Sequence, residues 1–236
     1  MSKHLKRLAA PRTWPIKRKV SVWVPKPSPG PHGVERSVPL YLLMRDMLNL
    51  CGTAREAKRI IGQRQILVDG KIATDPKLPV GLMDVVSVPK TKEHFRMMLN
   101  KLGVFSLVRI DDASAKWKLA RVERKVSVRG GKMQLGLHDG RCAVVEKTKV
   151  KTGDTLKIEV PSQKVLGVYA LDKGNMAMLV AGLHVGELHA IEGYKVTRNP
   201  KANMVTFADG LSTVKGNVFV VGKDAPEVKM PEVSAL

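Results

Sequence analysis

The sequence predicts a multidomain α+β chain with helices in the first hundred residues and mostly strands after them. Apolar residues recur at helical spacing over residues 41–61. From residue 105 onward, short apolar runs alternate with turn residues, which is typical of small β domains. Seven prolines between residues 11 and 39 exclude a long helix or a central strand there. A length of 236 residues provides for two or three such domains.

The charge balance points to an anionic partner. Lys and Arg number 41 against 21 Asp and Glu, a net charge of +20. By segment the net charge is +8 over residues 1–36, +4 over 37–100, +7 over 101–172 and +1 over 173–236. A hydrophobic fraction of 44% excludes a disordered basic tail, and 4% aromatic residues favour phosphate contacts over extensive base stacking.

No motif in the chain requires catalysis, a cofactor or a metal. Phosphate-binding glycine loops, the H-E-x-x-H pattern and the G-x-S-x-G pattern are all missing. Cys51 and Cys142 are 91 positions apart and are expected to be buried free thiols. His184 and His189 have a spacing that suits neither one helix face nor one strand face. The sequence also lacks a membrane span and a signal peptide.

Residues 1–36 are predicted to form a basic, proline-rich arm. A disordered linker is the alternative, but Trp14 and Trp23 favour an arm that becomes ordered on a partner. Deleting such an arm would leave the other domains intact. The candidate RNA contacts of the arm are Lys3, Lys6, Arg7, Arg12, Lys17 and Arg18.

Residues 37–100 are predicted to begin with two helices and a hairpin. The first helix covers 41–51, and Thr53 with Glu56 forms a capping box for the second, which extends to about residue 61. Asp69-Gly70 indicates a two-residue type I′ turn. A strand over 84–88 follows, and then a helix near residues 91–102.

The second helix is expected to separate an apolar face from a basic one. Ala54, Ala57 and Ile61 share the first face, and three basic residues at i, i+3 and i+4 share the other. A solvated helix surface is the alternative to a phosphate-binding array. The candidate RNA contacts are Arg45, Thr53, Arg55, Lys58, Arg59, Gln63, Arg64 and Lys71, with Thr53 presenting backbone N–H donors.

The remaining chain is predicted as a central β domain over 101–172, a second β domain over 173–221 and a frayed tail over 222–236. Strands are expected at 105–110, 118–123, 125–129, 133–138, 141–146, 155–160, 165–171, 176–181, 188–197, 204–208 and 211–219. The expected structural turn glycines are Gly70, Gly140, Gly186 and Gly210.

Residues 44–76 resemble the small RNA-binding domain first described in the fourth small-subunit ribosomal protein. Arg45-Asp46 fits the opening of that pattern without its intervening leucine. Thr53, Arg55 and Lys58 fit its basic helix, although the arginine stands one place later than usual. Val68-Asp69-Gly70 replaces the usual Val-Asn-Gly of its hairpin.

Three further stretches, the last of them residues 174–191, resemble the archaeal and eukaryotic branch of that ribosomal family. KHLKRLAAPRTWP at the start and PSPGPHG before the domain are similar to this branch. Residues 174–191 resemble a KOW element with Gly186 at its centre, so 173–221 is expected to be a KOW-type small β-barrel. The slightly acidic C-terminal segment lacks a long basic extension, which favours an archaeal source.

The resemblance implies a structural, non-enzymatic protein of the small ribosomal subunit, located in the cytoplasm, without cofactors. Its partners would be ribosomal RNA and neighbouring ribosomal proteins, with no membrane and no homo-oligomer. The alternatives are an RNA-modifying enzyme such as a pseudouridine synthase, for which 136 residues after position 100 leave little room, and a KOW-type factor that binds protein.

Overall fold

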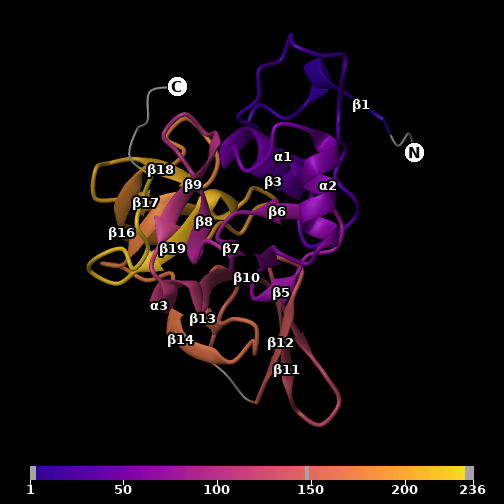
Figure 1. Cartoon of the computed structure of the whole chain (residues 1–236). Coiled ribbons are helices and arrows are strands. Elements are labelled where there is room, and N and C mark those ends of the chain that lie inside the picture. The colour runs from indigo at the N-terminus through magenta and orange to yellow at the C-terminus, as the bar shows by residue number, and fades with distance from the viewer. Residues whose placement is uncertain (1–3, 147–148, 232–236) are drawn as a thin grey trace. The chain divides into compact units, whose positions relative to one another are not determined.

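The computed structural model describes residues 4–146 and 149–231 (Figure 1). The chain divides into two compact units, one of residues 1–99 with 104–118 and the other of residues 100–103 with 119–236. Both are mostly β, with short helices only. The predicted boundary at residue 100 differs from this division, because the strand at 105–110 pairs within the first unit.

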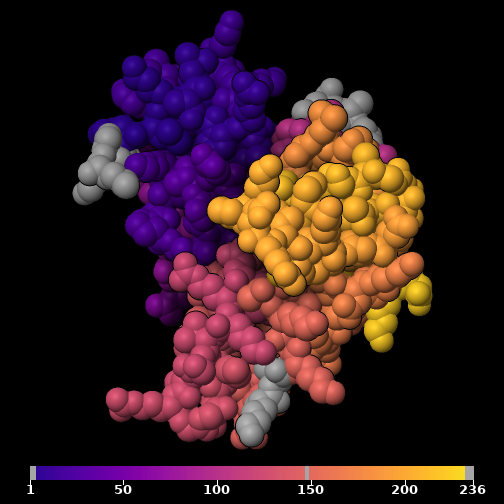
Figure 2. Space-filling model, turned by 180° about the vertical axis from the view of Figure 1, so that it is seen from behind, coloured from indigo at the N-terminus to yellow at the C-terminus, as the bar shows by residue number. Residues whose placement is uncertain are grey.

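The N-terminal arm is a folded part of the first unit. Strand β1 (Leu5–Lys6) pairs with β2 (Trp23–Val24), and a 3₁₀ turn at Arg7–Ala9 follows β1. Trp14 is 2% exposed, and its indole nitrogen donates to the Ser37 carbonyl at 2.6 Å. In the space-filling view of Figure 2, the indigo N-terminal residues form one compact group of atoms. The prediction of an arm that is ordered only on a partner is therefore corrected.

Two arginines of the arm connect its segments through side-chain hydrogen bonds. Arg7 is buried and donates to the Lys17 carbonyl and to the Ser21 hydroxyl. Arg18 donates to the carbonyls of Leu8, Ala10 and Pro11. Guanidinium groups satisfy several carbonyls at once, which explains how a chain so rich in proline closes on itself. Burial corrects the prediction that Arg7 contacts RNA, whereas Arg18 is half-buried and its RNA contact stays a prediction.

The helical part of the first unit is shorter than predicted. Strand β3 (Ser37–Pro39), which follows a 3₁₀ turn at Val34–Arg36, pairs with β6 (Pro79–Gly81). Helix α1 (Leu40–Leu42) continues as one π-helical turn (Leu43–Met47), and α2 (Ala54–Gly62) follows. On α2, Ala57 and Ile61 are buried, whereas Ala54, the first residue of the helix, is exposed.

The main sheet of the first unit has the strand order β5-β4-β7-β8-β9. Its strands are β4 (Leu67–Val68), β5 (Lys71–Ile72), β7 (Val85–Val88), β8 (Glu93–Leu99) and β9 (Phe105–Ile110). The helix predicted near 91–102 is wrong, because β8 is paired along both edges. Arg96 on β8 is buried and donates to the carbonyls of Ser114 and Trp117, the first of them in helix α3 (Asp112–Ala115).

The second unit begins with a sheet of order β12-β11-β10-β13-β14. Strand β10 (Trp117–Ser127), whose first two residues belong to the first unit, is continuous where two strands were predicted. The others are β11 (Met133–Leu137), β12 (Cys142–Val145), β13 (Thr155–Glu159) and β14 (Val165–Tyr169). Strands β11 and β12 extend away from the rest of this sheet (Figure 1). Cys142 is exposed, contrary to prediction, whereas Cys51 is buried.

A second antiparallel sheet of this unit has the order β18-β17-β16-β15-β19. Its strands are β15 (Met176–Leu179), β16 (Leu188–Lys195), β17 (Met204–Phe207), β18 (Ser212–Val214) and β19 (Val218–Gly222), with a 3₁₀ turn at Lys215–Asn217 before β19. That turn interrupts the single strand predicted at 211–219. Arg121 on β10 donates to the carbonyls of Gly216 and Val218, which joins the two sheets of the unit.

The C-terminal segment is packed rather than frayed as far as it is described. Val228 is 3% exposed, and Glu227 pairs with Lys157 at 2.6 Å. The Tyr169 hydroxyl donates to the other Glu227 oxygen. Burial, together with this hydrogen bond, raises the pKa of Tyr169 to about 12. The predicted tail at 222–236 is therefore corrected over 222–231, and its last five residues lie outside the described part.

Candidate nucleic-acid interface

Helix α2 begins with the predicted capping box. The Thr53 hydroxyl accepts from the Glu56 backbone N–H at 3.3 Å, and the Glu56 carboxylate accepts from the N–H groups of Thr53 and Gly52. The hydrogen bond from Gly52, followed by that from Thr53, lowers the pKa of Glu56. The N–H groups of Gly52, Thr53 and Glu56 are thus satisfied inside the protein, and Thr53 acts as the helix cap. The contact of this helix start with phosphate stays a prediction.

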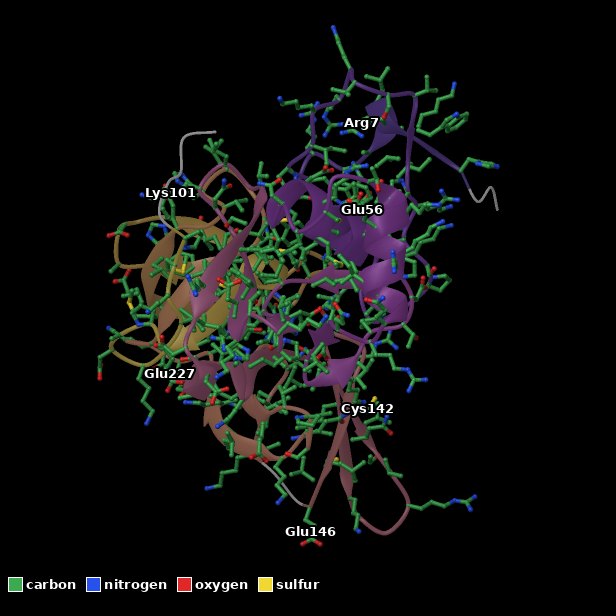
Figure 3. All side chains as sticks on the ribbon, in the orientation of Figure 1. Arg7, Glu56, Lys101, Cys142, Glu146 and Glu227 are labelled. Atoms are coloured by element: carbon green, nitrogen blue, oxygen red, sulfur yellow. The ribbon has the colours of Figure 1, made fainter. Side chains whose placement is uncertain are left out.

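Five exposed cations lie on α2 and on the segment and hairpin strand that follow it. We define the cation face as Arg55, Lys58, Arg59, Arg64 and Lys71, all of them exposed. None of the five pairs with a carboxylate in the part of the chain that the structure describes. Figure 3 shows nitrogen-tipped side chains extending outward from α2, with Glu56 near its beginning. Exposed cations without an acidic partner, gathered this closely, favour the binding of a polyanion such as nucleic acid.

Other predicted contact residues vary in how accessible they are. Arg45 forms a bidentate pair with Asp46 at 2.7 and 2.8 Å and lies over the Tyr41 ring. The hydrogen bond with Asp46 raises the pKa of Arg45. Gln63 is exposed and accepts from Gln65 at 2.7 Å. Three residues of the arm, Lys6, Arg12 and Lys17, are exposed, and Lys3 lies outside the described residues.

A buried charge network fixes the hairpin after α2. Asp69 and Gly70 have φ values of 49° and 69°, as a type I′ turn requires. The Lys118 ammonium, fully buried, lies 2.6 Å from an Asp69 oxygen and 2.9 Å from an Asp84 oxygen. His32 approaches the second Asp84 oxygen at 2.9 Å. The network thus joins four segments of the first unit and positions the turn that carries Lys71.

The network makes the stability of the first unit sensitive to acid. Burial by itself raises the pKa of Asp84. The opposite effect of Lys118 and then of His32 is larger in sum, so the net pKa lies below the ordinary value. A lowered folded pKa contributes stability above the unfolded value of about 3.9, and this stability is lost as the pH falls below it. Urea unfolding followed by tryptophan fluorescence measures this, because all three tryptophans belong to the first unit.

We expect a steep loss of stability below about pH 4. Asp84→Asn provides the control, since it removes the titrating carboxyl. The variant should be less stable than the wild type at neutral pH, and its stability should fall less on acidification. Parallel pH profiles for the two proteins would contradict this assignment.

A basic groove in the second unit was missed by the sequence reasoning. The cavity has a volume of about 1210 Å³ between the two sheets of that unit. We define the lysine groove by five lysines that line it, Lys125, Lys149, Lys151, Lys173 and Lys215. Lys215 lies 5.3 Å from the Tyr194 ring centre. Asp154 and Asp172 are also in the lining, and the oxygens of Asp154 accept from the backbone N–H groups of Lys151 and Leu171.

The described residues contain no cluster of metal-binding side chains. No group of three or more His, Cys, Asp or Glu side chains among them could hold a metal ion. His184 and His189 both approach Glu187, and His189 also contacts Asp209 at 2.6 Å. Over the same residues, no helix is long and apolar enough to cross a membrane.

Exposed cations on a helix-and-hairpin unit are typical of a nucleic-acid-binding protein. The S4 domain model matches residues 46–86, the RS4NT domain model residues 1–35 and the model of ribosomal family S4e residues 91–165. The chain belongs to the S4e family of ribosomal proteins. This family is structural and not enzymatic, so the expectation of a non-enzyme is confirmed and the RNA-modifying alternative is set aside.

Relatives match along nearly the whole chain. The small ribosomal subunit protein eS4 of Korarchaeum cryptofilum is 42% identical in an alignment 235 positions long that covers 97% of each chain. The protein of the same name from Methanothermobacter thermautotrophicus is 38% identical over 97% of this chain and 96% of its own. The crystal structure of 30S ribosomal protein S4e from Thermoplasma acidophilum has a TM-score of 0.70 and 36% identity, covering 80% of this chain and 96% of that one. The resemblance to the archaeal and eukaryotic branch is confirmed.

Proposed function

We propose that the chain is a structural constituent of the small ribosomal subunit that binds and stabilises folded ribosomal RNA. The observation that carries the mechanism is the cation face, whose five side chains are exposed and unpaired in the described residues. Lys and Arg that meet phosphates release the counterions condensed on the RNA, which supplies free energy without base readout. Neighbouring ribosomal proteins are its other partners, and it acts as a single copy in the cytoplasmic ribosome.

The second unit supplies another RNA contact. The lysine groove gathers cations from β10, from the segment before β13 and from the turns next to β15 and β19. Its charge is not visible in the near-neutral total of residues 173–236, because three of its five lysines come from before residue 173. We assign residues 173–221 to a KOW-type small β-barrel, supported by its five antiparallel strands and by the close packing at Gly186.

Removing charge from α2 tests the proposal. Replacing Arg55, Lys58 and Arg59 together with Ala should weaken binding to small-subunit ribosomal RNA and make the plot of log K against log salt shallower by about 2–3 units. The fold should persist, because Ala is a good helix former and these positions are exposed. The measurement is an equilibrium binding titration at several salt concentrations.

A matched triple variant controls for the loss of net charge. Replacing Lys195, Arg198 and Lys201 with Ala also removes three positive charges, from the exposed end of β16 and the connection that follows it. Its slope should stay within about half a unit of the wild-type slope. Equal effects of the two triples would show that net charge, and not the cation face, determines binding.

A further inference from the structure

A small cavity beside α2 combines aromatic surface with cations. It has a volume of about 350 Å³ and lies between the N-terminal arm and α2, within the first unit. This volume falls within the range of small-ligand sites, roughly 300–1,000 Å³. We define the aromatic pocket by six of its lining residues, His4, Trp23, Lys26, Tyr41, Lys58 and Lys77.

The packing of the first unit does not account for the exposed position of Trp23. Its side chain is 56% exposed, whereas Trp14 of the same arm is buried. The pairing of β1 with β2 holds Trp23 in place, with its ring centre 5.6 Å from that of His4. A large indole fixed on a strand and still exposed presents a ready surface for another flat ring.

The charges around the pocket have a single sign. Lys26, Lys58 and Lys77 come from three separate segments of the first unit, and the described residues that line the pocket include no carboxylate. Lys58 also belongs to the cation face, so the pocket is continuous with the surface that we assign to phosphate contacts. Proteins that bind single-stranded nucleic acid combine aromatic side chains, on which bases stack, with cations that pair with phosphates.

We propose that the aromatic pocket binds one unstacked nucleotide of the ribosomal RNA. The base stacks on Trp23, and the flanking phosphates pair with Lys58 and the two other lysines. This inference rests on the proposed function, because it names a site for the same RNA. The pocket adds a contact with a base to a surface whose other proposed contacts are with phosphates.

The test compares RNA with and without bases on the full chain. The probes are a labelled hexauridylate and an abasic ribose-phosphate hexamer of equal charge, measured by fluorescence anisotropy. The wild type should bind hexauridylate more tightly. Trp23→Ala should weaken hexauridylate binding about 5- to 150-fold and leave the abasic hexamer within about twofold. Trp23→Phe should recover most of the loss, because it keeps an aromatic ring.

The neighbouring residue supplies a matched control. Val22 is 67% exposed and does not line the pocket, so Val22→Ala should bind both hexamers as the wild type does. Equal wild-type affinity for the two hexamers, or an unchanged preference in Trp23→Ala, would overturn the pocket. Salt-dependent binding to small-subunit ribosomal RNA would then still support the proposed function. If the wild-type chain did not bind small-subunit ribosomal RNA, both the aromatic pocket and the proposed function would be overturned.

Cross-linking in intact small subunits decides between RNA and a protein as the occupant. A nucleotide adduct on Trp23 after ultraviolet irradiation supports the proposal. Lysine cross-links from Lys26 and Lys77 to a neighbouring protein, with no adduct on Trp23, would overturn it.

Discussion

Replacing Lys118 with methionine is expected to destabilise the first unit by about 3–5 kcal/mol. The Lys118 side chain is fully buried, and its ammonium is paired with Asp69 and Asp84, which are themselves nearly buried. Removal of one member of such a group leaves carboxylates without a countercharge in a medium that solvates them poorly. Methionine fills similar space, so the loss of stability comes from charge and not from a cavity.

Urea unfolding followed by tryptophan fluorescence measures this effect in the first unit. Lys116→Met is the control, because Lys116 is two positions away, is 69% exposed and forms only a surface pair with Asp112. Its effect should stay within about 0.5 kcal/mol. If Lys118→Met proved as mild as the control, the buried network would contribute little to the stability of the hairpin.

Replacing Gly186 with valine is expected to destabilise the second unit by about 2–6 kcal/mol, as backbone strain and overpacking each contribute about 1–3. Gly186 has a φ of 79°, which disfavours any residue with a Cβ. A Cβ there would lie 2.4 Å from the carbonyl oxygen of Asn100 and 2.9 Å from the Lys101 nitrogen. These are backbone atoms, so no side-chain rotation relieves the overlap.

Thermal melting by circular dichroism and hydrogen exchange over β15 and β16 detect this loss. Gly186→Ala places a Cβ at the same point and should retain most of the effect. Gly216→Val is the control, since Gly216 has open space around it and no positive φ. The salt dependence of RNA binding should not change in any of the three variants. A normal melt for Gly186→Val would contradict the tight packing described here.

The features that could be predicted from the sequence depend on residues close in the chain. The capping box needs only Thr53 and Glu56, and the hairpin turn needs only Asp69-Gly70. Alternation and turn residues placed β9 correctly at 105–110. The resemblance of residues 44–76 to the small RNA-binding domain located that domain, which the S4 domain model matches over 46–86, because its motif is contiguous.

The features that could not be predicted depend on contacts between distant residues. The segment of β8 contains good helix formers, but pairing on both edges and the burial of Arg96 make it a strand. Lys118 is 49 residues from Asp69, and no spacing rule connects them. The lysine groove and the aromatic pocket likewise collect residues from separate segments, which a count of charge along the chain does not reveal.

The salt dependence of binding between the wild-type chain and small-subunit ribosomal RNA tests the central claim most directly. If roughly six to ten Lys and Arg side chains meet phosphates, log K should fall with log salt with a slope of about −5 to −9. The affinity should then decrease about 10³- to 10⁵-fold between roughly 50 and 200 mM salt. A slope near zero, with binding that persists in high salt, would contradict the account.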